Sequence, residues 1–504
     1  MHIRKLKSRN GNLQIQVVQK IGRQNKVVRH LGTARNELEI HELIRLAKQF
    51  IQDQRIKSGR LSLFDNRYST SEMAEILSQF CIRRVLDSVT FNFFYHFYHV
   101  LDFDQIGNKS FADLVVARII FPVSKAKTRD FLEGKLDKHY SLSGLYRIME
   151  EIYNLNFQSQ LEEKMTSFVK SFSPTISVLF FDVTTLYYES FDEDDLRKFG
   201  FSKDNKAHQP QLVVTLTVTA DGFPLHLRVF PGNKFEGHLM LPCIMEIVKK
   251  HKIDDFVVVA DSAMVSQTNM EELERENLSY IVGARLGNLS TKMWEQIITV
   301  LKIDGATKRF DFGNNRILVV SYSQKRANKD RSDREKQLKR AQFALNNPSV
   351  VAKRFKFLKK VKNHDLELNT ENVAKSKLLE GLKGYLTNAA DLTDEEIISK
   401  YSQLWQVEKS FRISKSDLKA RPVFHTVKER IEAHLTIVFA SLAIIRLVEK
   451  TTGKSVKKVL WLLDQVKEVV MENTVSRERI SKYSEVKNQE TKELLKIAKL
   501  NWGT

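Results

Sequence analysis

Two aspartates occupy unusual places in otherwise apolar stretches of the chain. Asp182 lies in VLFFDVTTL, and Asp261 lies in FVVVADSAM. A carboxylate buried among apolar neighbours is unfavourable unless it is hydrogen-bonded, paired with a cation or bound to a metal ion. Capping of a turn or of a helix would account for either residue alone. Two such acids in one segment favour a shared Mg²⁺ site, because Mg²⁺ prefers oxygen ligands and keeps several of its waters.

Further residues that could do chemistry lie on a predicted helix near residue 400. At about 100° per residue, Tyr401, Glu408 and Lys415 drift by only about 20° per seven-residue step. Arg412 falls within about 20° of Tyr401 on the same face. This face would present a carboxylate beside cations that suit phosphate groups. The plainer alternative is an exposed stripe with a Glu408–Arg412 pair, worth only a few tenths of a kcal/mol.

The segment that carries the two aspartates has the pattern of an α/β domain. The apolar run SVLFFDVTTLYYES is followed by QLVVTLTVTADGFPLHLRVF, which predicts two strands joined at Asp221-Gly222. Next come a predicted helix (HLMLPCIMEIVKKH), the strand that ends at Asp261, a second helix (NMEELERENL) and the strand YIVGARL. Three strands in a meander, followed by strands alternating with helices, predict a domain of the ribonuclease H type.

Residues 290–380 interrupt this alternation. RFDFGNNRILVVSYS predicts a hairpin, and the following KRANKDRSDREKQLKRAQFAL predicts a basic, charge-rich helix. We interpret this region as an insertion into the α/β domain. It ends at KGYLTNAADLTDEEII, where Thr393 and Glu396 predict a capping box that opens a long helix.

The flanking regions differ from the α/β segment. Residues 1–36 contain nine Lys or Arg and no acid, and their alternation around Gly22 predicts a β-hairpin whose basic side chains could follow a phosphate backbone. Residues 37–54 have helical periodicity. Residues 69–170 are helical in pattern and weakly similar to a helix-turn-helix DNA reader, and a helical tail is expected beyond residue 451.

The charge of the whole chain restricts its partners. Lys and Arg total 81 and Asp and Glu total 61, a net charge of +20, which favours nucleic acid first and an anionic membrane surface second. The apolar run 435–445 is too short to span a bilayer, and MHIRKLKSRNGN is not followed by an apolar signal segment. The two cysteines, Cys81 and Cys243, form no CxxC pair. We therefore expect an intracellular protein without a membrane span or a disulfide framework.

With these residues in view, the sequence resembles the DDE transposases of bacterial insertion sequences. Tyr401, Glu408 and Lys415 match the Tyr-(2)-Arg-(3)-Glu-(6)-Lys signature of that family, but Leu404 stands where the signature has Arg. FFDVTTLYYES is similar to the segment with the first catalytic Asp, and VVVADSAMVSQTNM to the segment with the second. FPGNKFEGH resembles the stretch between them, so the resemblance spans residues 177–447.

The resemblance implies an α/β fold with a ribonuclease H-like catalytic domain interrupted by an insertion, a helical N-terminal DNA-binding region and a helical C-terminal tail. The expected parts are 1–65 (basic hairpin plus helix), 66–175 (helical DNA-binding region), 176–290 (first part of the core), 291–385 (insertion), 386–450 (core with the Glu helix) and 451–504 (tail).

The resemblance also implies a chemistry. Asp182, Asp261 and Glu408 would be the catalytic residues and would hold two Mg²⁺ ions, with Mn²⁺ able to substitute. Tyr401, Arg412 and Lys415 would bind DNA phosphates. The expected partners are double-stranded DNA, as terminal inverted repeats and as target, and a second copy of the chain in the DNA complex. The expected location is the bacterial cytoplasm, at the nucleoid.

Two other functions are compatible with the same residues. The first is a ribonuclease H-like nuclease that hydrolyses nucleic acid without strand transfer. The second is a transposase-derived DNA-binding protein that has lost its chemistry, to which the Leu404 departure points. Such a protein would bind specific DNA and would not respond to Mg²⁺, whereas the presence of all three acids favours an enzyme.

Overall fold

The computed structural model describes residues 1–8, 12–22, 24–57, 78–189, 191–201, 208–262, 266–299, 302–347, 355–360 and 366–499. The chain divides into two compact units, of which the first comprises Met1–Ile82 with Met471–Arg479. The second comprises Arg83–Val470 with Ile480–Thr504 and contains every candidate site residue.

The first unit contains a three-stranded antiparallel sheet and one helix. The strands are β1 (His2–Lys7), β2 (Leu13–Ile21) and β3 (Gln24–Ala34), and helix α1 (Glu37–Lys57) follows. The predicted hairpin is present, because Ile21 pairs with Gln24 across a turn at Gly22, whose φ of +62° suits glycine. Strand β1 was not predicted. The expected boundary at residue 65 lies outside the described residues.

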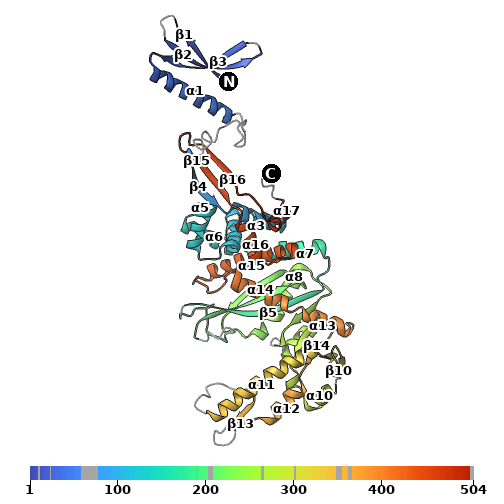
Figure 1. Ribbon diagram of the computed structural model, residues 1–504. Helices are drawn as coiled ribbons and strands as arrows, with labels where there is room; N and C mark the ends of the chain where they lie inside the picture. The colour runs from blue at the N-terminus through green and yellow to red at the C-terminus, as the bar shows by residue number, and fades with distance from the viewer. Residues whose placement is uncertain are drawn as a thin grey trace. The chain divides into compact units, whose positions relative to one another are not determined.

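Strand β4 (Phe80–Leu86) contains the boundary at Ile82, and the second unit is helical after this strand. Its helices before the main sheet are α3 (Ser88–Val100), α4 (Lys109–Ile120), α5 (Lys125–Leu136), α6 (Leu142–Asn154) and α7 (Phe157–Phe172). Near the C-terminus lie α15 (Lys428–Thr452), α16 (Val456–Asp464) and α17 (Gln489–Ile497) (Figure 1). Helix α15 packs against α3, α4, α6 and α7, and so forms the centre of the helical layer.

Helix α15 is also long and apolar enough to cross a membrane by length and composition. However, 94% of its most apolar window is buried inside the protein. An all-round apolar helix is what the centre of a helical core requires. The apolar character of α15 is therefore accounted for by packing against its neighbouring helices.

An eight-stranded mixed sheet forms the second layer of this unit. Its strands are β5 (Val178–Tyr187), β6 (Gln211–Val218), β7 (Pro224–Pro231), β8 (Val257–Ala260), β9 (Ser279–Ala284), β10 (Thr307–Gly313), β11 (Arg316–Tyr322) and β14 (Leu382–Thr387). The order is β10-β11-β14-β9-β8-β5-β6-β7. Strands β8 and β9 run parallel to β5, and the other neighbouring pairs are antiparallel. Helix α8 (Met240–His251) joins β7 to β8, and α9 (Gln267–Arg275) joins β8 to β9.

The expected boundary at residue 291, between the first part of the core and the insertion, does not match the sheet seen in the structure. Strands β10 and β11 belong to the same sheet as β5, because β11 pairs with β14 and β14 pairs with β9. The elements that leave the sheet are α11 (Gln324–Asn346), β12 (Leu358–Lys360), β13 (Leu366–Leu368) and α12 (Thr370–Leu378). Pairing between strands far apart in the chain cannot be read from local periodicity, and this is why the sequence placed β10 and β11 outside the core.

The tail beyond residue 451 is not wholly helical. Strands β15 (Glu468–Asn473) and β16 (Arg479–Tyr483) lie between α16 and α17 and form a three-stranded sheet with β4. The expectation of purely helical segments over 66–175 and 451–504 is therefore wrong at these three strands. Each of them is short, and its partner is distant in sequence or was itself expected to be helical.

Candidate active site

The two aspartates occupy neighbouring positions of parallel strands, Asp182 within β5 and Asp261 directly after the end of β8. Phe181 of β5 pairs with Ala260 of β8, so Asp182 and Asp261 occupy the next position of the same register. Neighbouring residues at one register position of a sheet point to the same face. Each carboxylate accepts a hydrogen bond from the next backbone N–H, Val183 N to Asp182 and Ser262 N to Asp261, both at 2.7 Å. Local backbone contacts therefore fix both acids at the place where open α/β sheets bind ligands.

The helix expected to carry the signature is broken into three segments. These are α13 (Asp394–Ser402), α14 (Trp405–Arg412) and a π-helical turn (Ile413–Asp417). The capping box at the start of α13 is confirmed, since Thr393 and Glu396 exchange hydrogen bonds of 2.9 and 3.2 Å. The expectation of one continuous helical face is wrong, because α13 ends at Ser402 and α14 begins at Trp405, with the buried Leu404 in the turn that joins them.

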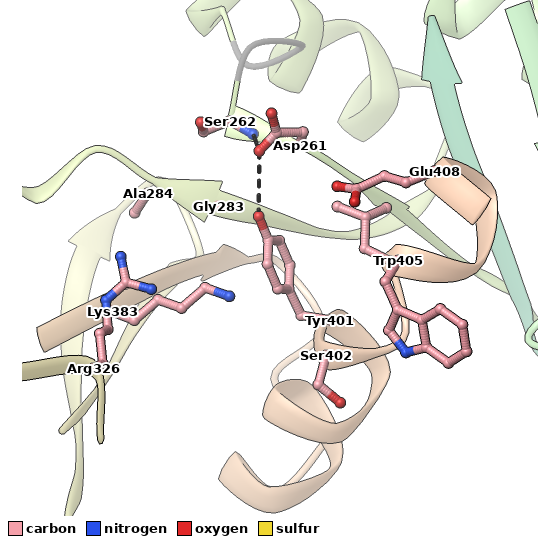
Figure 2. A pocket seen from close by; sticks show the side chains of 12 residues that line it. Asp261, Ser262, Gly283, Ala284, Arg326, Lys383, Tyr401, Ser402, Trp405 and Glu408 are labelled. Atoms are coloured by element: carbon pink, nitrogen blue, oxygen red, sulfur yellow. Dashed lines mark hydrogen bonds between the residues drawn. The ribbon is translucent and has the colours of Figure 1, made fainter. Parts of the chain in front are cut away.

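The tertiary fold nevertheless brings Tyr401 and Glu408 together. A cavity of about 390 Å³ is lined by Asp261, Tyr401 and Glu408, with Arg326 and Lys383 on another part of its wall (Figure 2). The exposed Glu408 reaches it from α14, and Asp261 from the end of β8. Asp182 does not line this cavity, although its register position is adjacent to that of Asp261.

Arg412 and Lys415 do not line the cavity either. Arg412 is exposed at the end of α14, and Lys415 is half-buried in the π-helical turn. Lys415 lies in the π-helical turn, where the spacing of a regular α-helix no longer applies, so it does not follow Tyr401 and Glu408 into the cavity. The structure thus places one of the three predicted phosphate-binding residues, Tyr401, in the wall of the cavity with Asp261 and Glu408.

The hydroxyl of Tyr401 contacts the carboxylate of Asp261. Its hydroxyl donates to Asp261 Oδ1 at 3.5 Å (Figure 2). Burial, and then the charge of Asp261, raise the pKa of Tyr401, so the hydroxyl keeps its proton and remains a donor. A Cβ built on Gly283 of β9 would collide with this hydroxyl. The absence of a side chain at position 283 is therefore what admits Tyr401 to the site.

Two cationic residues that line the cavity were not predicted from the sequence. Lys383 lies on β14, with Nζ 4.4 Å from the ring centre of Tyr401, and Arg326 lies in the first turn of α11. Burial, followed by the charge of Arg326, lowers the pKa of Lys383, while Asp261 and Glu408 oppose this decrease. The signal for Lys383 was a charged residue within the apolar run LKGYLT, the same criterion that selected Asp182. Arg326 gave no signal, because it lies in a helix rich in charges.

The helix of Glu408 is anchored to the turn between β6 and β7. Ser410 Oγ donates to the carbonyl of Gly222 at 3.1 Å. The buried Arg446 of α15 donates to the same carbonyl at 3.0 Å and to Gln406 Oε1 at 2.6 Å. The predicted turn at Asp221-Gly222 therefore does more than reverse the chain, since it fixes α14 relative to the sheet.

The carboxylates suit a hard divalent cation by their chemistry. Oxygen ligands are what Mg²⁺ takes from proteins, with water completing its coordination. In the described part of the chain, no Lys or Arg forms an ion pair with Asp261 or Glu408, so both acids are available to a ligand. Among the same residues, no three His, Cys, Asp or Glu side chains are already gathered as a metal site. The oxygen ligands fit Mg²⁺, and a bound ion would draw the acid side chains together around it.

Comparisons with known proteins identify a family for this part of the chain. The family described as "Transposase DDE domain" matches residues 173–444, which include all three acids. Among solved structures, the chain is similar to one described as a piggyBac transposase synaptic complex with hairpin DNA. That likeness has 9% identity and a TM-score of 0.37, over 75% of this chain and 70% of the other. No curated protein matches the chain.

Proposed function

The chain belongs to the transposase DDE domain family, and from this premise we propose that it cuts DNA at the ends of a bacterial insertion sequence and joins them to target DNA. The observation that carries the proposal is that Asp261 and Glu408 open into one cavity while Asp182 holds the adjacent register position. Two acids from separate elements thus share one cavity, and we propose that Asp182 of β5 is the third acid of the set.

The topology supports a ribonuclease H-like core. Strands β5, β6 and β7 form an antiparallel meander, and β8 and β9 are added in parallel on the other side of β5. The helix of Glu408 packs against β5 and β6. This is the arrangement in which a third acid from a helix approaches two acids at strand ends.

In the proposed reaction, Asp182, Asp261 and Glu408 would hold two Mg²⁺ ions, or Mn²⁺ in their place. The metals would activate water, and then a DNA 3′-hydroxyl, for in-line attack on phosphorus. Tyr401 orients the Asp261 carboxylate through its hydroxyl, and Lys383 places positive charge where a scissile phosphate gains negative charge. The half-exposed Trp405 at the cavity offers a surface on which a base can stack.

DNA is the partner that the charge favours, and we propose that it enters as terminal repeats and as target. Arg412 and Lys415 would bind phosphates outside the cavity, along the chain that leaves α14. A homodimer in the DNA complex would bring two ends together. These steps would take place at the nucleoid of a bacterial cytoplasm.

Leu404 is the residue that pointed to the alternative function, a transposase-derived protein that binds DNA without cutting it. Its side chain is 6% exposed and lines the cavity, so the signature Arg has no counterpart at this position. Lys383 and Arg326 line the same cavity and supply positive charge from other elements. This compensation favours an active transposase over a protein that only binds DNA.

The test uses a duplex that carries the sequences flanking this gene, incubated with the protein and Mg²⁺ or Mn²⁺, with breaks mapped at nucleotide resolution. We expect cuts at discrete ends, and joining of these ends to a second duplex. Asp182→Asn, Asp261→Asn and Glu408→Gln should each abolish cleavage and retain DNA binding. Glu395→Gln, an exposed acid on α13, is the matched control and should cut normally.

Each outcome has a separate meaning. Cleavage without joining would indicate the nuclease, and specific binding without metal-dependent cuts would indicate the decayed protein. Normal cleavage by any one of the three acid variants would remove that residue from the proposed set.

A further inference from the structure

A cluster of positive and titratable side chains lies in the helical layer, away from the cavity of Asp261 and Glu408. We call it the cationic cluster, and it consists of Arg118 (α4), Lys125 (first residue of α5), His425 (before α15) and His434 (α15). The rings of His425 and His434 are 5.5 Å apart between centroids. Helix α4, which carries Arg118, packs against both α5 and α15. Burial, followed by the charges of Arg118 and Lys125, lowers the pKa of each histidine.

The two strong bases of the cluster are buried without a counter-ion. Arg118 is 6% exposed and Lys125 is 4% exposed. Among the described residues, neither side chain forms a hydrogen bond or an ion pair. Burial lowers the pKa of Arg118 to about 10 and that of Lys125 well below its ordinary value.

This lack of pairing sets the cluster apart from the rest of the fold. Every other buried Asp, Glu, Lys or Arg among the described residues has an oppositely charged partner. The pairs are Asp113–Lys138, Glu162–Arg228, Arg197–Asp194, Arg316–Glu274, Glu380–Arg334, Arg446–Glu449 and Glu472–Arg479. Burial of an unpaired charge is strongly unfavourable. An anion that is bound when the protein acts would remove that penalty.

The chemistry of the cluster selects a phosphate. Guanidinium and ammonium groups are donors only, and they pair best with oxygen-rich anions. Lys125 begins a twelve-residue helix, so the free N–H groups and the dipole of α5 also favour an anion there.

Two exposed aromatic rings favour a nucleic acid over a free anion. Phe121 (43% exposed) lies between Arg118 and Lys125 in the chain, and Phe424 (68% exposed) precedes His425. Exposed aromatic rings beside cations are the usual means of holding an unpaired base and its phosphate.

We propose that the cationic cluster is a second DNA-binding site, in which Arg118, Lys125 and the two histidines take a backbone phosphate while Phe121 or Phe424 stacks on a base. The site rests on the proposed function, since it assumes DNA as the substrate. It shares no residue with the cavity of Asp261 and Glu408.

The test compares Lys125→Met and Arg118→Met with Lys127→Met, an exposed cation on the same helix. Binding of a fluorescent oligonucleotide with an unpaired 3′ segment is measured by anisotropy over a range of salt, and thermal unfolding is followed in parallel. We expect Lys125→Met and Arg118→Met to weaken binding about tenfold and to reduce the salt slope by about 1. Their Tm should be equal to or above that of the wild type, because an unpaired buried charge is removed. Lys125→Arg should restore most of the affinity.

The opposite results would overturn the inference. A lower Tm with unchanged DNA affinity would show a purely structural cluster. Equal losses in Lys125→Met and Lys127→Met would show only general charge attraction. Stabilisation of the wild type by inorganic phosphate, with DNA affinity unaffected in both variants, would show a free-anion site.

The same experiment separates this site from the proposed function. Glu408→Gln should bind the oligonucleotide like the wild type and fail to cut, whereas Lys125→Met should bind weakly. If the wild type cuts DNA and Lys125→Met binds normally, only the inference fails. If the wild type never cuts, the proposed reaction fails, while the binding difference still decides the cluster.

Discussion

Lys383 places a positive charge beside two carboxylates of the candidate active site. Its ammonium group lies over the ring of Tyr401, and burial lowers its pKa. We predict that Lys383→Met lowers the cleavage rate about 10²-fold, the usual effect of losing one donor aimed at developing charge. Single-turnover cleavage at saturating protein measures this rate. Lys377→Met removes an exposed charge from α12 and should leave the rate unchanged, and an equal loss in both variants would contradict a specific role for Lys383.

Gly283 permits the close approach of Tyr401 to Asp261. We predict that Gly283→Ala displaces the Tyr401 hydroxyl and lowers the cleavage rate about tenfold, because misplacement of a positioned group by about 1 Å is costly. Gly287→Ala is the control, since a Cβ there meets nothing within 4 Å. In a Tyr401→Phe background, Gly283→Ala should have little further effect. Independent losses in the double variant would show that Gly283 acts by another route.

At the scale of elements, the position of Glu408 depends on contacts of α14 with its neighbours. Arg446 links α15 to the turn at Gly222 and to Gln406, and its side chain is 7% exposed. We predict that Arg446→Met lowers the free energy of unfolding by about 3 kcal/mol, because it removes the part-buried ion pair with Glu449 and the hydrogen bonds to Gln406 and to the backbone carbonyls of Asp221 and Gly222. Urea unfolding measures this change, and the cleavage rate should fall with it.

The matched control for this anchor is a salt bridge at the same turn. Lys450 pairs with Asp221 at 2.6 Å, but both side chains are about half-exposed. Lys450→Met should therefore change the free energy of unfolding by less than about 1 kcal/mol. If the two variants were equally destabilised, the buried anchor would have no special role in holding α14.

At the scale of the whole molecule, the net charge of +20 predicts DNA binding that weakens steeply with salt. The hairpin of β2 and β3 presents exposed Lys20 and Lys26 at neighbouring positions of its register. We predict that the double variant Lys20→Gln/Lys26→Gln reduces the salt slope of DNA binding by about 2, which anisotropy titrations measure. The control is Lys48→Gln, which removes an exposed charge from α1. If the double variant reduces the salt slope less than Lys48→Gln does, the hairpin is not part of the DNA-binding surface.

Local signals in the sequence located the acids and several elements. Asp182 and Asp261 stood out because a carboxylate is rarely placed in an apolar strand, and Thr393 with Glu396 marked the start of α13. Gly22 marked the hairpin of the first unit. Each of these features depends on a few adjacent residues, so periodicity and turn chemistry are sufficient to find them.

The tertiary structure decided which distant residues meet. It divided the expected helix into α13 and α14, with the buried Leu404 directly before α14. It joined β10, β11 and β14 to the main sheet, and so brought Lys383 to the carboxylates. It also buried Arg118 and Lys125 together without a counter-ion. Pairing between strands and the balance of buried charges depend on contacts between residues far apart in the chain, and local patterns carry no record of those contacts.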